Sequence, residues 1–98
     1  MTIADKLQNA LQLHQSGNLA DAGLLYQEIL REDPDQVDAL NLLGVVLSTA
    51  GKMDAAITLL SRACELAPDF AGPFVNLGNV LQAMGRLDEA VDAFQKGL

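Results

Sequence analysis

Few residues in this chain have the chemistry of a catalytic centre. His14 is the only histidine and Cys64 the only cysteine, so the chain can form neither a cluster of imidazole and thiolate metal ligands nor an internal disulfide. The sequence pattern places these two residues on helices of different repeat units, which disfavours a nucleophile and base pair. We therefore expect a protein that is not an enzyme and that needs no cofactor.

The carboxylates gather where helices should begin, and this position favours a structural role. Asp35 and Asp69 each follow a proline and are placed to cap the next helix. Asp33, Asp35 and Asp38 are not followed by the glycine-bearing loop and distal glutamate of a calcium-binding loop. The chain also lacks the glycine-rich runs that cradle phosphate groups.

Charge and composition narrow the classes of partner. The net charge is -7 and no basic face is evident, which disfavours nucleic acid and anionic membranes as partners. Hydrophobic residues make up 50% of the chain, but no apolar stretch approaches the length of a membrane span. The first residues do not resemble a secretory signal. We therefore expect a globular cytoplasmic protein whose partner is another protein or an extended peptide.

The strongest pattern in the sequence is an internal repeat with a period of 34 residues. Several independent columns share this period, which is very unlikely to arise by chance. The columns include Gly17, Gly51 and Gly85; Ala22, Ala56 and Ala90; and Tyr26, Leu60 and Phe94. The repeat predicts one domain over residues 1–98, divided into units at 3–36, 37–70 and 71–98.

Within each unit the hydrophobic spacing is helical. Leu40, Leu43 and Leu47 lie at positions i, i+3 and i+7 of one face, and no segment alternates as a strand would. The three columnar glycines end the first helix of each unit, and Pro34 and Pro68 end the second helix of the first and second units. These patterns predict helices over 3–15, 19–32, 36–49, 53–66, 70–83 and 87–98.

Two glycines recur inside predicted helices, at Gly44 and Gly78. A glycine within a helix costs about 1 kcal/mol relative to alanine, so its recurrence needs a packing reason. We expect the two helices of each unit to approach closely at these glycines, beside Ala56 and Ala90. Stacked units would then bury a continuous core that one unit cannot form alone.

These positions resemble the tetratricopeptide repeat (TPR) family, whose pattern is W-x2-L-G-x2-Y, then A-x3-F, then P. The third unit reads Phe74-x2-Leu77-Gly78-x2-Leu81, then Ala90-x3-Phe94. The resemblance covers essentially the whole chain. It implies an all-α fold, a right-handed α-solenoid of three helix-turn-helix units with six antiparallel helices. No helix that would cap the C-terminal end is present in the sequence.

The first unit departs from the pattern in its first helix. Lys6 and Asn9 occupy the columns of Leu40 and Leu43, and Ala10 replaces the glycine. An atypical terminal unit is what the exposed end of a solenoid requires.

The resemblance further implies a concave groove lined by the first helix of each unit. Its amides and aliphatic side chains suit the backbone of an extended peptide, although each leucine or valine has packing against adjacent helices as an equal alternative. The expected lining residues are Leu7, Gln8, Leu11, His14 and Gln15; Asp38, Asn41, Leu42, Val45 and Ser48; and Gly72, Val75, Asn76, Asn79 and Gln82.

Two subclasses of the family match this sequence to different degrees. The cations with which some TPR domains clamp a C-terminal carboxylate are missing, which disfavours that ligand. The third unit is instead similar to the TPR arm of O-linked N-acetylglucosamine transferases, and Asn76 fits the asparagine ladder of that arm. Alternatives to a peptide scaffold are therefore a non-catalytic arm of a larger enzyme, or a homo-oligomer formed through the last helix. The apolar residues predicted to mediate self-association are Leu87, Val91, Phe94 and Leu98.

Overall fold

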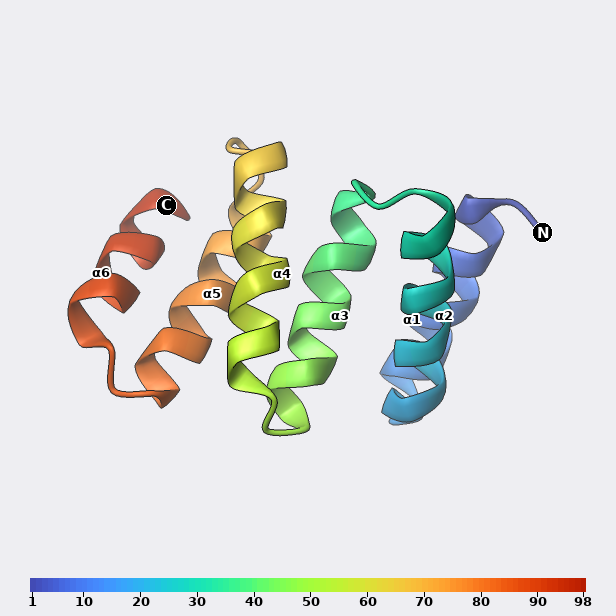
Figure 1. The fold of residues 1–98 in the computed structure, drawn as a ribbon, viewed down its shortest axis with the longest axis horizontal. Coiled ribbons are helices and arrows are strands. Elements are labelled where there is room, and N and C mark those ends of the chain that lie inside the picture. Colours follow the sequence, from blue (N-terminus) through green and yellow to red (C-terminus); the bar gives the residue numbers. More distant parts are fainter.

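The computed structural model describes all of residues 1–98 and contains six helices and no strands. The helices are α1 (Ile3–Gln15), α2 (Leu19–Glu32), α3 (Val37–Thr49), α4 (Met53–Leu66), α5 (Ala71–Ala83) and α6 (Leu87–Lys96). They form three antiparallel pairs stacked in a row, with the two termini at opposite ends (Figure 1). The molecule measures 41 × 25 × 19 Å, as expected for stacked units. None of its helices has the length and apolar character that a membrane crossing requires.

The turn within each unit depends on glycine, as the sequence predicts. Gly17, Gly51 and Gly85 have φ angles of 86°, 82° and 77°, in the left-handed region that only glycine adopts without strain. The amide that follows each glycine turns back onto the preceding helix, and the Asn18 N–H donates to the Leu13 carbonyl at 2.8 Å. Each glycine therefore ends its helix and reverses the chain.

The predicted aspartate caps are wrong, because α3 and α5 each begin one residue later than expected. Gln36 caps α3, and its side-chain oxygen accepts a hydrogen bond from the Ala39 N–H at 2.7 Å. Phe70 precedes α5 and makes no capping hydrogen bond through its side chain. Asp35 instead lies 2.9 Å from Arg62 of α4 and joins two units at the surface.

Glycine permits the close approach of the paired helices. A Cβ atom built on Gly44 would lie 2.7 Å from Leu60 Cγ, and one on Gly78 would lie 2.5 Å from Phe94 Cε1. Real Cβ atoms do not approach other atoms so closely, so each glycine makes room for a large side chain of the partner helix. The predicted close approach is confirmed, with Leu60 and Phe94 filling the space beside the glycines.

The core is concentrated towards the first unit. Its largest cluster combines α1, α2 and α3, where Tyr26 and Ile29 are fully enclosed. The atypical Lys6 does not disturb this core, since its ammonium group lies 3.0 Å from Glu28 and 2.9 Å from Glu32 of α2. Two smaller clusters follow, around Leu60 and around Ala90.

Candidate functional site

The second and third units approach each other on the side of their first helices, α3 and α5. α3 contacts α5 directly, and Asn76 Nδ2 donates to Asn41 Oδ1 at 2.8 Å between these two helices. No comparable approach joins α4 to α6. We call the side of α1, α3 and α5 the inner face and the side of α2, α4 and α6 the outer face. Figure 1 looks onto the outer face, with α2 and α4 in front of α1 and α5.

A hollow of about 190 Å³ lies on the inner face between α3 and α5. Its floor is apolar, because Leu60 is fully buried and Val80 is nearly so. Its rim consists of uncharged polar side chains together with Val45. The complete lining is Val45, Ser48, Thr49, Leu60, Asn76, Asn79 and Val80. Hydroxyl and amide groups over an apolar floor can bind a peptide backbone and one aliphatic side chain.

The structure brings together four of the residues predicted for the groove, namely Val45, Ser48, Asn76 and Asn79. Sequence reasoning missed Thr49, Leu60 and Val80 as lining residues. Thr49 and Val80 lie four positions after Val45 and Asn76, on the same helix faces, so the helical period held enough information to find them. Leu60 reaches the hollow because Gly44 lacks a side chain.

Asn41 differs from the expectation that it lines the groove. Only 6% of its surface is exposed, and its side-chain oxygen accepts the hydrogen bond from Asn76. α5 covers it, and the missing side chain of Gly72 leaves room above its amide group. Asn41 therefore orients Asn76 instead of facing a ligand.

The predicted groove residues of the first unit and Leu42 serve the core in part. Leu7 and Leu42 pack against the largest core cluster, so the packing alternative describes them better. Leu11 is half-buried, whereas Gln8 is exposed. His14 Nδ1 lies 3.1 Å from the hydroxyl oxygen of Tyr26, whose pKa is raised by burial.

At the other end of the inner face, Val75 and Gln82 are exposed but lie outside the hollow. A Cβ atom on Gly97 would lie 3.1 Å from Val75 Cγ2, so Val75 sits beside the end of α6. The exposed inner surface thus extends beyond the hollow without forming one continuous pocket.

The last helix presents only part of its predicted apolar patch. Leu87 and Val91 are 59% and 54% exposed, and Leu98 is fully exposed. Phe94 instead turns inward against Gly78, because that glycine leaves space for its ring. Phe94 was wrongly predicted to lie on the exposed patch.

No group of three or more histidine, cysteine, aspartate or glutamate side chains is positioned to hold a metal ion. Cys64 is buried, and burial raises the pKa of its thiol, which lowers its reactivity. The groups around the inner hollow are uncharged hydrogen-bonding groups and hydrocarbon.

Family models support this description. A tetratricopeptide repeat model matches residues 7–69, and a second tetratricopeptide repeat model matches residues 74–98. The chain belongs to the tetratricopeptide repeat family. Its fold is an all-α solenoid of three helix-turn-helix units. Repeats of this family suggest a scaffold for protein interactions, and such units are typically non-catalytic.

The first two similarities concern parts of much longer proteins, so this chain spans only a small share of their length. Human tetratricopeptide repeat protein 7A is 39% identical over 82 residues, which cover 84% of this chain and 10% of that protein. A Thermobaculum terrenum O-GlcNAc transferase structure superposes with a TM-score of 0.95 and 33% identity, covering 98% of this chain and 18% of that one. The second TPR of Spaghetti (RPAP3) superposes with a TM-score of 0.90 at 16% identity, covering 97% of this chain and 88% of that one, which supports the fold alone.

Proposed function

We propose that this chain is a scaffold that binds an extended, largely uncharged peptide segment of a partner protein along its inner face. The observation that carries the proposal is the inner hollow, where the Asn76 and Asn79 amides stand over buried Leu60 and Val80. Amides can pair with the N–H and C=O groups of a peptide, and the apolar floor can bury one of its side chains.

The inner face is also preorganised for binding. Asn76 is held by its hydrogen bond to Asn41, so little side-chain freedom is lost when a peptide pairs with it. The lining carries no charge, so an acidic peptide tail would gain no ion pair there. A neutral segment with an aliphatic side chain suits this surface better.

A display experiment tests the proposal without knowledge of the natural partner. Peptides would be selected from a random library against the wild-type chain, and their affinities then measured by titration against variants. We expect Val45→Glu with Asn79→Ala to weaken the selected peptides about tenfold or more, through a charge beside the apolar floor and a lost amide.

The matched control changes the outer face in the same way. Thr58→Glu with Gln27→Ala places a charge and removes an amide at exposed positions. This variant should bind the selected peptides like the wild type. Equal binding by the inner-face variant, with its helical circular dichroism unchanged, would contradict the inner-face assignment.

A second candidate function is the non-catalytic arm of a larger glycosyltransferase. The position of Asn76 in the inner hollow and the likeness to the T. terrenum enzyme favour it. Reading the gene beyond both ends of this sequence tests the idea. A glycosyltransferase domain in the same reading frame would support it, and a frame without one would exclude it.

Self-association through α6 is a third candidate, favoured by the exposed Leu87, Val91 and Leu98. Sedimentation against concentration tests it, with Val91→Glu as the disrupting variant because Phe94 is turned inward. A concentration-dependent dimer that Val91→Glu abolishes would support the candidate. A strict monomer for both proteins would exclude it.

A further inference from the structure

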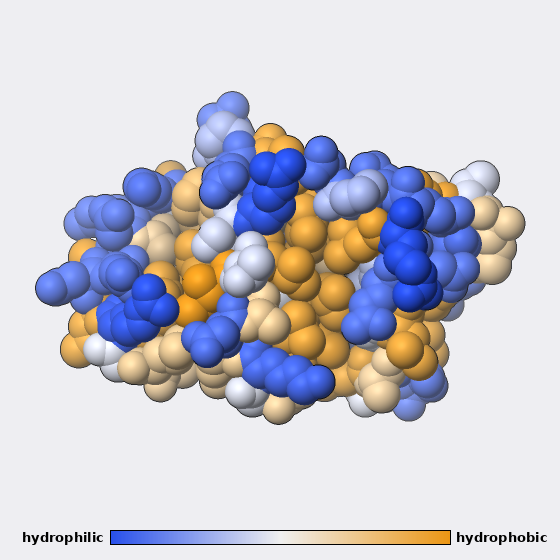
Figure 2. Space-filling model, viewed as in Figure 1, coloured by the Kyte–Doolittle hydropathy of each residue, from blue (hydrophilic) through white to orange (hydrophobic).

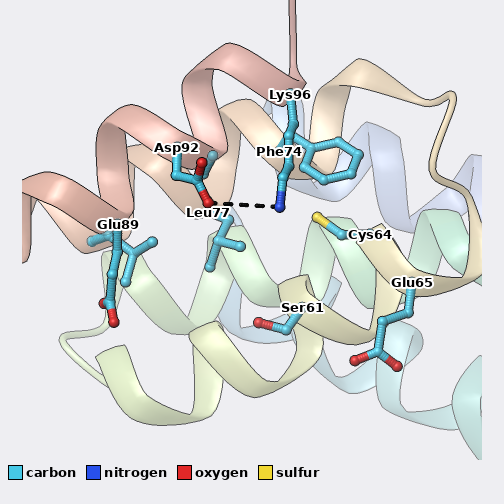
Figure 3. Close-up of a pocket in the computed structure, with 10 residues that line it drawn as sticks. Ser61, Cys64, Glu65, Phe74, Leu77, Glu89, Asp92 and Lys96 are labelled. Carbon is cyan, nitrogen blue, oxygen red and sulfur yellow. Dashed lines mark ion pairs between the residues drawn. The ribbon is translucent and has the colours of Figure 1, made fainter.

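A second hollow lies on the outer face, where α4, α5 and α6 meet (Figure 3). Its volume is about 310 Å³, and it shares no residue with the inner hollow. Phe74, Leu77 and Leu81 of α5 form its apolar floor together with Ala93 of α6. Figure 3 shows Glu65, Glu89 and Asp92 around its opening, with Lys96 reaching across towards Cys64.

The hollow exists because two buried side chains of its lining are smaller than those at the equivalent positions one period earlier. Cys64 and Ala93 correspond, at a spacing of 34 residues, to Leu30 and Leu59. Leu30 and Leu59 pack against the largest core cluster, and no hollow opens at that junction. The same backbone arrangement is therefore filled between the first and second units and open between the second and third.

The charge around the opening changes at the same place. Three rim positions carry carboxylates, whereas their equivalents one period earlier carry one cation and two uncharged side chains. The pairs are Glu65 for Arg31, Glu89 for Ala55 and Asp92 for Thr58. Loss of volume and gain of negative charge are independent changes, and they coincide at one junction.

The carboxylates are only partly neutralised by the chain itself. Glu65 lies 3.6 Å from Arg62, but that arginine is closer to Asp35, at 2.9 Å. Asp92 lies 3.6 Å from Lys96, an ion pair in which both side chains are exposed. Glu89 is held by Arg86. Exposed ion pairs contribute little, so a cation of a partner can replace or join them.

We propose that this outer hollow binds a segment of a partner protein that carries one bulky apolar side chain beside a basic residue. The apolar side chain enters between Phe74, Leu77 and Leu81, and the basic residue pairs with Glu65 or Asp92 at the rim. Figure 2 shows apolar side chains between α4 and α6, bordered by hydrophilic ones, on this face. The net charge of -7 also attracts a cationic partner.

The test uses capped dipeptides as probes and backbone amide signals in nuclear magnetic resonance as the readout. N-acetyl-phenylalanyl-arginine amide at millimolar concentrations should shift the signals of Cys64, Leu77 and Ala93 more than those of Val45 and Asn79. The charge-reversed probe, N-acetyl-phenylalanyl-glutamate amide, should bind roughly two- to fivefold more weakly. Equal binding of the two probes, shifts confined to the inner face, or no shift at all would overturn the proposal.

Variants taken from the chain's own first junction sharpen the test. Cys64→Leu with Ala93→Leu restores the residues of the filled junction and should weaken the arginine probe about tenfold or more. Glu65→Arg with Asp92→Thr restores the first junction's residues at two of the three rim positions, and should remove the preference for the arginine probe while leaving the fold intact. Unchanged binding by the first variant, or an unchanged preference in the second, would contradict the proposal.

Discussion

The two junctions between units are built on the same repeat but differ in how well they are filled. One cluster of six buried residues spans the first junction, whereas a cluster of only three spans the second and a further cluster of three lies within the third unit. Leu43 and Leu77 occupy the same column, yet Leu43 is 5% exposed and Leu77 is half-buried. The repeat thus sets the backbone arrangement, while side-chain volume decides whether a junction is sealed.

The difference in volume runs through several positions. Where the first junction has Ile29, Leu30 and Leu59, the second has alanine, cysteine and alanine at positions 63, 64 and 93. Helices of fixed spacing cannot close over side chains that are smaller at every one of these positions. The volume missing at Cys64 and Ala93 appears as the outer hollow, which both residues line. A tandem repeat can therefore acquire a pocket at one junction without any change of fold.

The largest expected effect comes from truncating the shared leucine column. Leu43→Ala removes a side chain from the sealed junction and should lower the free energy of unfolding by about 3 kcal/mol. Leu77 borders the open junction, where truncation loses fewer contacts. Leu77→Ala should therefore lower the free energy of unfolding by about half as much. Urea denaturation of both variants measures the difference. Equal losses would mean that the two junctions are equally well packed.

The second prediction concerns the two helix glycines. Gly44→Ala forces a Cβ atom against fully buried Leu60 and should destabilise the protein by about 1–2 kcal/mol, after the gain of about 1 kcal/mol in helix propensity. Gly78→Ala should cost less although its contact is closer, because Phe94 is half-buried and its ring can move outward. The reverse order in thermal or urea unfolding would show that Phe94 is the more rigid neighbour.

Filling the outer hollow should make the second junction resemble the first. Cys64→Leu with Ala93→Leu adds hydrocarbon above Leu77 and should raise the free energy of unfolding by about 1 kcal/mol. The single variant Cys64→Leu serves as the control and should gain less. If the double variant unfolds at lower urea concentration than the wild type, the hollow cannot accept leucine as the first junction does.

An effect of similar size is expected at Tyr26, the one polar side chain in its column. Tyr26→Phe removes the hydrogen bond with His14 and should cost about 1 kcal/mol near neutral pH. Burial raises the pKa of the Tyr26 phenol above its ordinary value of 10.0, so the folded chain keeps a proton that the unfolded chain loses. The stability of the wild type should therefore fall as the pH rises above about 10.

The Tyr26→Phe variant isolates the contribution of the Tyr26 phenol to the pH dependence of stability, because the raised pKa of the Cys64 thiol affects variant and wild type equally. Urea unfolding between neutral and alkaline pH should show the stabilities of wild type and Tyr26→Phe converging above about pH 10. Parallel profiles over the whole range would indicate that Tyr26 does not keep its proton in the folded state.

The helices and their order could be predicted from the sequence. The period of 34 residues, the helical spacing of Leu40 and Leu43, and the glycines at each turn are local features, and local backbone preferences act the same way in every unit. The packing role of Gly44 could also be predicted, because glycine is unfavourable inside a helix and yet recurs one period later at Gly78. For these reasons the six helices and the stacked architecture are confirmed by the structure.

Tertiary structure alone decided which side chains are open to a partner. Asn41 and Asn79 both stand on predicted inner helices. Asn41 on α3 is buried beneath α5, whereas Asn79 on α5 itself is exposed. The outer hollow likewise depends on Cys64 and Ala93, which lie on different helices and meet only when the units stack. Exposure and cavity volume are set by neighbours distant in sequence, so the local preferences that determine helices do not determine them.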